Sequence, residues 1–73
     1  MNLNTLWQMA REALETQEAF AVSSRKICRL LGVMSISRQQ VREAFAQDEI
    51  DDLRMQFHWV TSETEWDIEI SRF

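Results

Sequence analysis

The first part of the chain has the hydrophobic pattern of an amphipathic helix. From Leu3 to Leu14, apolar residues recur at intervals of three or four, and most positions between them are polar. This period places the apolar side chains on one face of a helix. We predict a helix over about residues 4–19, with Asn2 or Asn4 as the residue that caps its start.

A second, shorter helix is predicted from its start and stop signals. Ser23 is a favoured N-cap residue, and Val22 and Ile27 have the spacing of a hydrophobic staple around it. Gly32 suits the left-handed residue that ends many helices. These signals predict a helix over about residues 24–32.

The third helix has the clearest start signal. Ser37 and Gln40 have the spacing of a capping box, in which each side chain bonds a free backbone N–H of the other. The helix is predicted over about residues 37–47, because an acidic run follows and would oppose the negative end of the helix dipole. The acidic residues of that run are Asp48, Glu49, Asp51 and Asp52.

After Leu53 the hydrophobic period changes from helical to two. Apolar and polar residues alternate in two runs separated by a short polar stretch, which is the pattern of a β-hairpin with one buried face. We predict strands over about residues 54–60 and 65–71. The positions expected in the core are Trp7, Met55, Phe57, Trp59, Trp66, Ile68 and Ile70.

Three helices followed by a hairpin is the element order of a winged helix-turn-helix. We therefore predict an α+β winged-helix fold in one domain, residues 1–73, since the chain has no Pro, one Gly and no linker-like stretch. Its 45% hydrophobic content, with three Trp and four Phe, is sufficient for a small core.

Composition excludes several classes of protein. One Cys cannot form an internal disulfide or a zinc cluster, and no apolar run approaches the ~20 residues of a membrane span. We find no catalytic constellation, and we predict neither a cofactor nor a metal site. We expect a cytoplasmic protein that does not bind membranes and is not an enzyme. Cys28 and His58 are assigned structural or incidental roles.

Charge is distributed unevenly along the chain. The net charge is −4, but residues 19–42 carry five basic residues and no acidic one, and the remaining residues sum to −9. Such asymmetry is a better guide to partners than the total. The basic middle of the chain points to an anionic partner, such as nucleic acid.

The basic residues fall on the second and third predicted helices. A third helix in the major groove places Arg38, Gln39 and Arg42 near base edges, where Arg pairs with guanine and Gln with adenine. Phosphates would fall to the second helix and to the free N–H groups at the start of the third. The candidate nucleic-acid-binding residues are Arg25, Lys26, Arg29, Ser37, Arg38, Gln39 and Arg42.

The same segment resembles a known family. The letters LGV and, after three further residues, SRQQVREAF are similar to the DNA-reading segment of the GntR family of bacterial repressors, over about 20 of the 73 residues. The matching residues are Leu31, Gly32 and Val33 in the turn, and Ser37, Arg38, Val41, Arg42, Glu43, Ala44 and Phe45 in the helix. The resemblance implies a transcriptional regulator of duplex DNA whose contacts come from Ser37, Arg38 and Arg42.

A different class of function is left open by the acidic positions. The basic face is also compatible with an ordinary solvated surface or an acidic protein partner. In the alternative hypothesis the chain is a protein-interaction module, such as a phage- or plasmid-type accessory protein or a DNA mimic, that docks through its acidic hairpin. The hairpin carboxylates are Glu63, Glu65, Asp67 and Glu69. One small module has limited contact area on DNA, so useful affinity is expected to require a homodimer or a larger complex with a protein partner.

Overall fold

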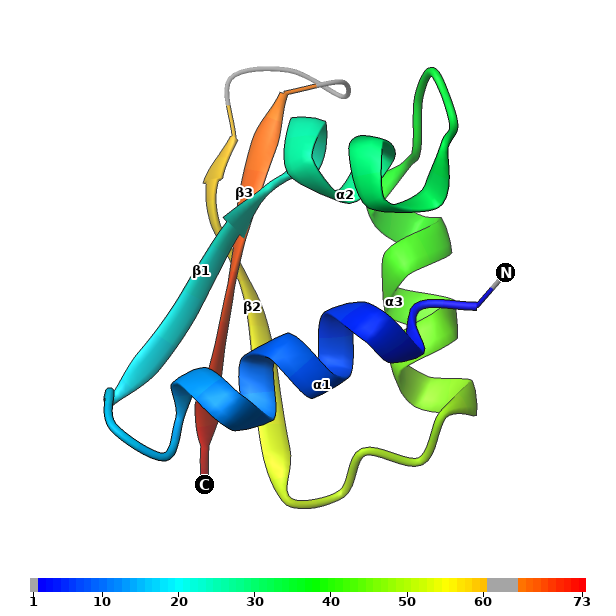
Figure 1. Cartoon of the computed structure of the whole chain (residues 1–73). Helices are drawn as coiled ribbons and strands as arrows, with labels where there is room; N and C mark the ends of the chain where they lie inside the picture. The colour runs from blue at the N-terminus through cyan, green and yellow to red at the C-terminus, as the bar shows by residue number, and fades with distance from the viewer. Residues whose placement is uncertain (1, 61–64) are drawn as a thin grey trace.

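The computed structural model describes residues 2–60 and 65–73. Within these residues the protein is α+β, with three helices and a three-stranded antiparallel sheet (Figure 1). The elements are α1 (Asn4–Ala13), β1 (Ala19–Ser23), α2 (Ser24–Leu31), α3 (Arg38–Gln47), β2 (Leu53–Val60) and β3 (Trp66–Arg72). The predicted α+β class is confirmed, and so are the two later helices and both strands of the hairpin to within one residue at each end.

The strand β1 was not predicted. The helix predicted over residues 4–19 ends at Ala13, and β1 pairs antiparallel with β3. Helical spacing of apolar residues stops after Leu14, so a longer helix would have no apolar stripe to bury. Val22 instead lies opposite Ile68 and is buried with it. The prediction for the first helix was therefore wrong by about six residues at its C-terminal end.

The sheet places β3 between the other two strands. The order is β1-β3-β2, so the predicted hairpin is two strands of a larger sheet. The β2–β3 register is regular up to Phe57, which lies opposite Ile68, and shifts between Phe57 and Trp59 through a bulge. The hairpin turn, the Glu63 carboxylate and the side chain of Trp59 lie outside the part of the chain that is described.

Both later helices begin and end at their predicted signals. The Ser23 hydroxyl accepts the Lys26 N–H at 3.2 Å, and Gly32 ends α2 with φ of 68°. At α3 the capping box is complete, because the Ser37 hydroxyl accepts the Gln40 N–H at 3.1 Å and the Gln40 side chain accepts the Ser37 N–H at 2.9 Å. These caps fix where α3 starts and hence which of its residues face outward.

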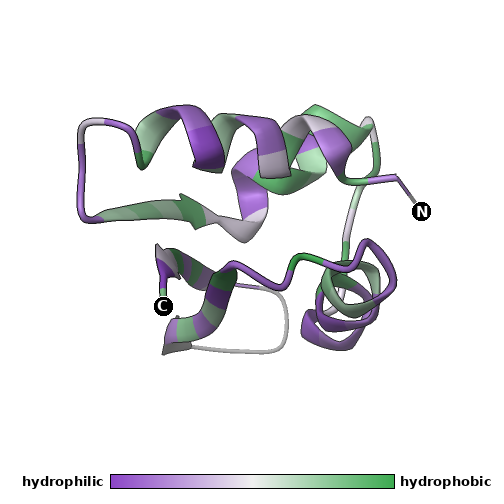
Figure 2. Cartoon of the chain, turned by 90° about the horizontal axis from the view of Figure 1, so that it is seen from below, coloured by the Kyte–Doolittle hydropathy of each residue, from purple (hydrophilic) through white to green (hydrophobic). Residues whose placement is uncertain are grey.

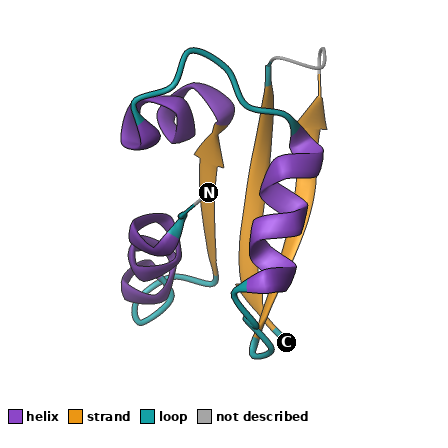
Figure 3. Ribbon diagram, turned by 90° about the vertical axis from the view of Figure 1, so that its right-hand side faces the viewer, coloured by secondary structure: helices purple, strands orange, loops and turns teal. Residues whose placement is uncertain are grey.

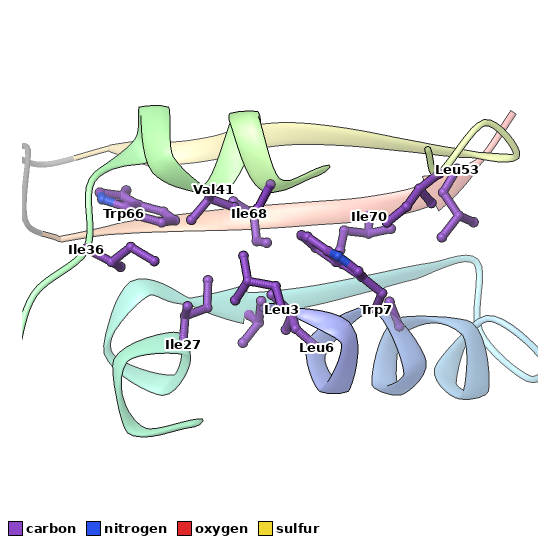
Figure 4. Packing of buried hydrophobic residues seen from close by; sticks show 14 of the residues in the cluster. Leu3, Leu6, Trp7, Ile27, Ile36, Val41, Leu53, Trp66, Ile68 and Ile70 are labelled. Atoms are coloured by element: carbon purple, nitrogen blue, oxygen red, sulfur yellow. The ribbon is translucent and has the colours of Figure 1, made fainter. Parts of the chain in front are cut away.

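The core lies between the helices and one face of the sheet. Along β2 and β3 hydrophobic and hydrophilic positions alternate (Figure 2). The residues of β3 that face the core, Trp66, Ile68 and Ile70, are buried. Helix α3 lies in front of the sheet in Figure 3, and the Arg42–Phe57 contact joins it to β2. Helices α1 and α2 both contact β1, and α2 also contacts β3. The close-up shows side chains from all three helices and the sheet pointing toward one another (Figure 4).

The largest buried side chains are Trp66, Leu3, Leu6, Ile27, Leu53, Ile68, Ile70 and Val41. Trp7 is also buried, as predicted, and Met55 and Phe57 pack against the core as partly buried residues.

Candidate nucleic-acid interface

Helix α2 presents its basic residues to solvent. Its inward side buries Ile27, and Arg25, Lys26 and Arg29 are exposed. The Arg25 guanidinium forms an ion pair with Glu65 at 2.8 Å, and both side chains remain more than half exposed, so solvent screens this pair strongly. The predicted basic face of α2 is therefore present, with Arg25 partly compensated.

The start of α3 carries the next two candidates. The Ser37 oxygen serves as helix cap, as described above, which leaves the hydroxyl proton able to donate to an anion. Arg38 follows in the first turn and is half-buried. The free N–H groups of this first turn add positive potential at the same end of the helix.

Farther along α3 the polar side chains are engaged with neighbours. The Gln39 amide donates to the Glu43 carboxylate one turn later at 3.1 Å. The Arg42 guanidinium lies over the Phe57 ring, 4.7 Å from its centroid, a cation–π contact that directs it toward β2. The structure thus gathers Arg25, Lys26 and Arg29 on α2, but Arg42 extends toward the sheet.

Two of the four carboxylates after α3 bond to α1, which the sequence did not lead us to expect. The Trp7 indole N–H donates to Asp48, and the Arg11 guanidinium donates to both Asp52 oxygens, at 2.8 and 3.0 Å. Hydrogen bonding to Arg11 holds the pKa of Asp52 below its usual value, and the same contact raises the pKa of Arg11. The two donors on α1, Trp7 and Arg11, are four residues apart, and so are the two acceptors in the loop. This matching spacing was visible in the sequence.

The acidic positions of the hairpin do not form a concentrated surface in the described residues. Glu65 is paired with Arg25. Glu69 is half-buried on the sheet face away from the core, with Ala21 and Gln56 at the neighbouring register positions. The hypothesis of docking through an acidic hairpin gains no specific support from this arrangement.

Neither Cys28 nor His58 belongs to a reactive cluster. Cys28 is a half-buried free thiol on α2, and His58 is an exposed residue of β2. Within residues 2–60 and 65–73, no three His, Cys, Asp or Glu side chains are grouped as ligands for a metal ion. These residues therefore provide no basis for proposing a reaction.

Comparison with known proteins returned no match, whether to a family model, to a curated protein or to a solved structure. Among the described helices, none has the length and apolar character needed to cross a membrane. The chemistry of the exposed surface must therefore indicate what the protein binds.

Proposed function

We propose that the protein is a small winged-helix module that binds duplex DNA and acts in transcription regulation. Helix α3 is the reader in the major groove, and α2 is the phosphate-facing helix. The order of elements supports this proposal, since α2 and α3 are consecutive and a β-hairpin follows α3. The likeness of the α2–α3 segment to the GntR family adds to it, because that segment coincides with these two helices.

One observation carries the proposal. Residues 19–42 contain five basic residues and no acidic one, and those on α2 are exposed on its outward side. Exposed positive charge attracts phosphates, and neutralising phosphates releases counterions from DNA. Glu65 partly compensates Arg25 of this face, whereas Asp48 and Asp52 are bonded to α1 instead.

The residues of α3 take different roles in this proposal. Ser37 and Arg38 lie at the start of α3, and in this proposal they contact phosphates or bases at the groove edge. Gln39 reaches a base edge by giving up its hydrogen bond to Glu43. Both side chains are exposed, so this hydrogen bond stabilises the helix only slightly. Arg42 reaches DNA only by leaving the Phe57 ring, so we expect its contribution to DNA binding to be small.

A binding titration with matched variants tests the proposal. Fluorescence anisotropy of a labelled mixed-sequence duplex is measured with wild type and with the Lys26→Ala, Arg29→Ala double variant. The control is Arg54→Ala, which removes one exposed charge from β2 instead of α2. We expect the double variant to bind several-fold more weakly and the control to match wild type. Equal binding by all three proteins, or no binding by wild type at ~50 mM salt, would refute the proposal.

The homodimer is part of the same proposal. A module of this size has limited contact area on DNA, and dimers commonly enlarge it. Sedimentation of the protein with a duplex gives the stoichiometry directly. We expect two copies per bound duplex, and a single copy at saturation would remove the dimer from the account.

A further inference from the structure

The free edge of β2 faces a groove beside α3. Within the described residues β2 pairs with β3 alone, so its other edge is the margin of the sheet. A groove of about 600 Å³ is lined by Arg42, Phe45, Met55, Gln56, Phe57 and His58. The four β2 residues in this lining are consecutive, so they come from both faces of the strand. A groove bordered by both faces of an edge strand runs along its unpaired edge.

The groove is lined by both apolar and polar side chains, and two aromatic rings of its lining rest on the core. Phe45 and Phe57 are partly buried and pack against the core. The Phe45 ring meets Trp7 edge-on at 5.3 Å, and the Phe57 ring meets Trp66 at 5.1 Å. Such contacts fix ring orientation, so the walls are formed before any ligand arrives.

Arg42 is the charged group of this groove. Its guanidinium lies over Phe57, and no carboxylate is among the side chains that line the groove. Two of the carboxylates in the loop before β2, Asp48 and Asp52, are bonded to α1. The groove is therefore complementary to a ligand with apolar side chains and a negative charge.

We propose that this groove binds an extended acidic peptide segment of a partner protein, which adds to β2 as a fourth strand. Backbone hydrogen bonds to the free edge provide affinity, apolar side chains contact Phe45 and Met55, and a carboxylate pairs with Arg42. The bulge after Phe57 limits regular pairing to residues 53–57. This partner is separate from DNA, although both ligands involve Arg42.

The test uses three acetylated, amidated heptapeptides. The first alternates glutamate and valine, the second alternates lysine and valine, and the third has the composition of the first with its glutamates grouped together. Binding is followed by backbone amide chemical shifts of the full chain. We expect the first peptide to shift the amides of residues 53–57 and of α3 near Arg42, and the other two to bind at least about fivefold more weakly, the scale of one exposed ion pair. Equal shifts from all three peptides, or no shifts at millimolar peptide, would overturn the proposal.

Backbone methylation separates strand addition from simple charge attraction. An added strand presents alternate N–H groups to β2 and the intervening ones to solvent. Two versions of the alternating glutamate–valine peptide are therefore compared, one N-methylated at the valines and one at the glutamates. Strand addition predicts that one version loses binding and the other retains it. The same affinity for both versions would contradict the proposed strand pairing.

Two protein variants connect the binding to the groove. Arg42→Ala is expected to weaken the glutamate–valine peptide about fivefold. Arg29→Ala, on α2, is expected to leave peptide binding unchanged while weakening DNA binding. A peptide that binds wild type and Arg42→Ala equally would refute the role of the groove, whatever the outcome with DNA.

Discussion

The acidic loop between α3 and β2 and the basic helix α2 are both dense in charge, but the molecule uses them differently. In the loop, Asp48 and Asp52 are exposed and bond Trp7 and Arg11 of α1. On α2, the basic side chains point outward, and Arg25 alone forms an ion pair with another part of the described chain. A run of like charge is thus left open to a charged partner only where the fold has not already supplied its counter-charges.

The reason for the difference is the position of each segment relative to the core. The loop must close a connection from the end of α3 to Leu53, and its carboxylates meet donors on α1 as it crosses. Helix α2 buries Ser24 and Ile27 and packs Cys28 and Leu31 against the core, while its basic side chains remain in solvent. The loop is therefore tied to α1, whereas the basic side chains of α2 remain exposed to solvent.

The largest expected effect comes from removing the loop's anchor in the core. Trp7 is buried, packs against Phe45 and donates to Asp48, so Trp7→Ala should cost about 3–5 kcal/mol of unfolding free energy. Arg29→Ala on exposed α2 should stay within about 0.5 kcal/mol of wild type. Urea denaturation monitored by circular dichroism measures both. Similar losses from the two variants would remove the distinction between the segments.

Variants at Ser37 test whether this residue both caps α3 and contacts DNA. Ser37→Ala removes the α3 cap and should cost about 1 kcal/mol of unfolding free energy. Ser37→Asp keeps a capping oxygen but adds negative charge at the end of α3 proposed to meet DNA. We expect Ser37→Asp to retain stability and to bind DNA more weakly than wild type. If Ser37→Asp binds DNA as tightly as wild type, this end of α3 does not approach phosphate.

The Arg11–Asp52 pair gives the loop a dependence on pH. Folding lowers the pKa of the Asp52 carboxyl, because the folded state favours its ionised form. The stability that this pair contributes is therefore complete above the unfolded pKa of about 3.9. It is lost as the pH falls through the pKa of Asp52 in the folded state. Asp52→Asn removes this contribution. Urea titrations of wild type and variant at several pH values should show a stability difference near neutrality that closes in acid. A difference that is constant between pH 7 and pH 2 would contradict the assignment.

The smallest effect is expected at the ion pair between Arg25 of α2 and Glu65. Glu65→Gln frees Arg25 from its exposed ion pair and should change the unfolding free energy by less than about 1 kcal/mol. DNA binding should become slightly tighter, since a positive charge is released and a negative one is removed. Anisotropy titration against Asp67→Gln as a control checks this. Weaker DNA binding by Glu65→Gln would show that the ion pair organises the basic face instead of reducing it.

Local signals predicted much of this fold, and long-range pairing accounts for most of what was missed. The caps at Ser23 and Ser37 and the stop at Gly32 act over a few residues, and each is found where predicted. Strand β1 forms because β3, more than forty residues later, supplies its partner. The bulge after Phe57 likewise depends on how two strands fit across the sheet.

The sequence predicted which charged residues the candidate site contains, but not how all their side chains are arranged. Sequence spacing correctly placed Arg25 and Arg29 away from the buried side of α2. It did not reveal that Arg42 would lie on Phe57, because that contact joins α3 to β2. The groove beside β2 was hidden for the same reason, since its walls come from two elements that the hydrophobic pattern describes separately.

The most direct test of the account is the salt dependence of DNA binding by the wild-type protein. If about three to four basic side chains of α2 and α3 neutralise phosphates, log affinity should fall linearly with log salt concentration with a slope of about −3. The measurement is an anisotropy titration of a mixed-sequence duplex between about 50 and 200 mM salt. A slope near zero, or no detectable binding across this range, would contradict the claim that the outward basic face of α2 and α3 is a nucleic-acid interface.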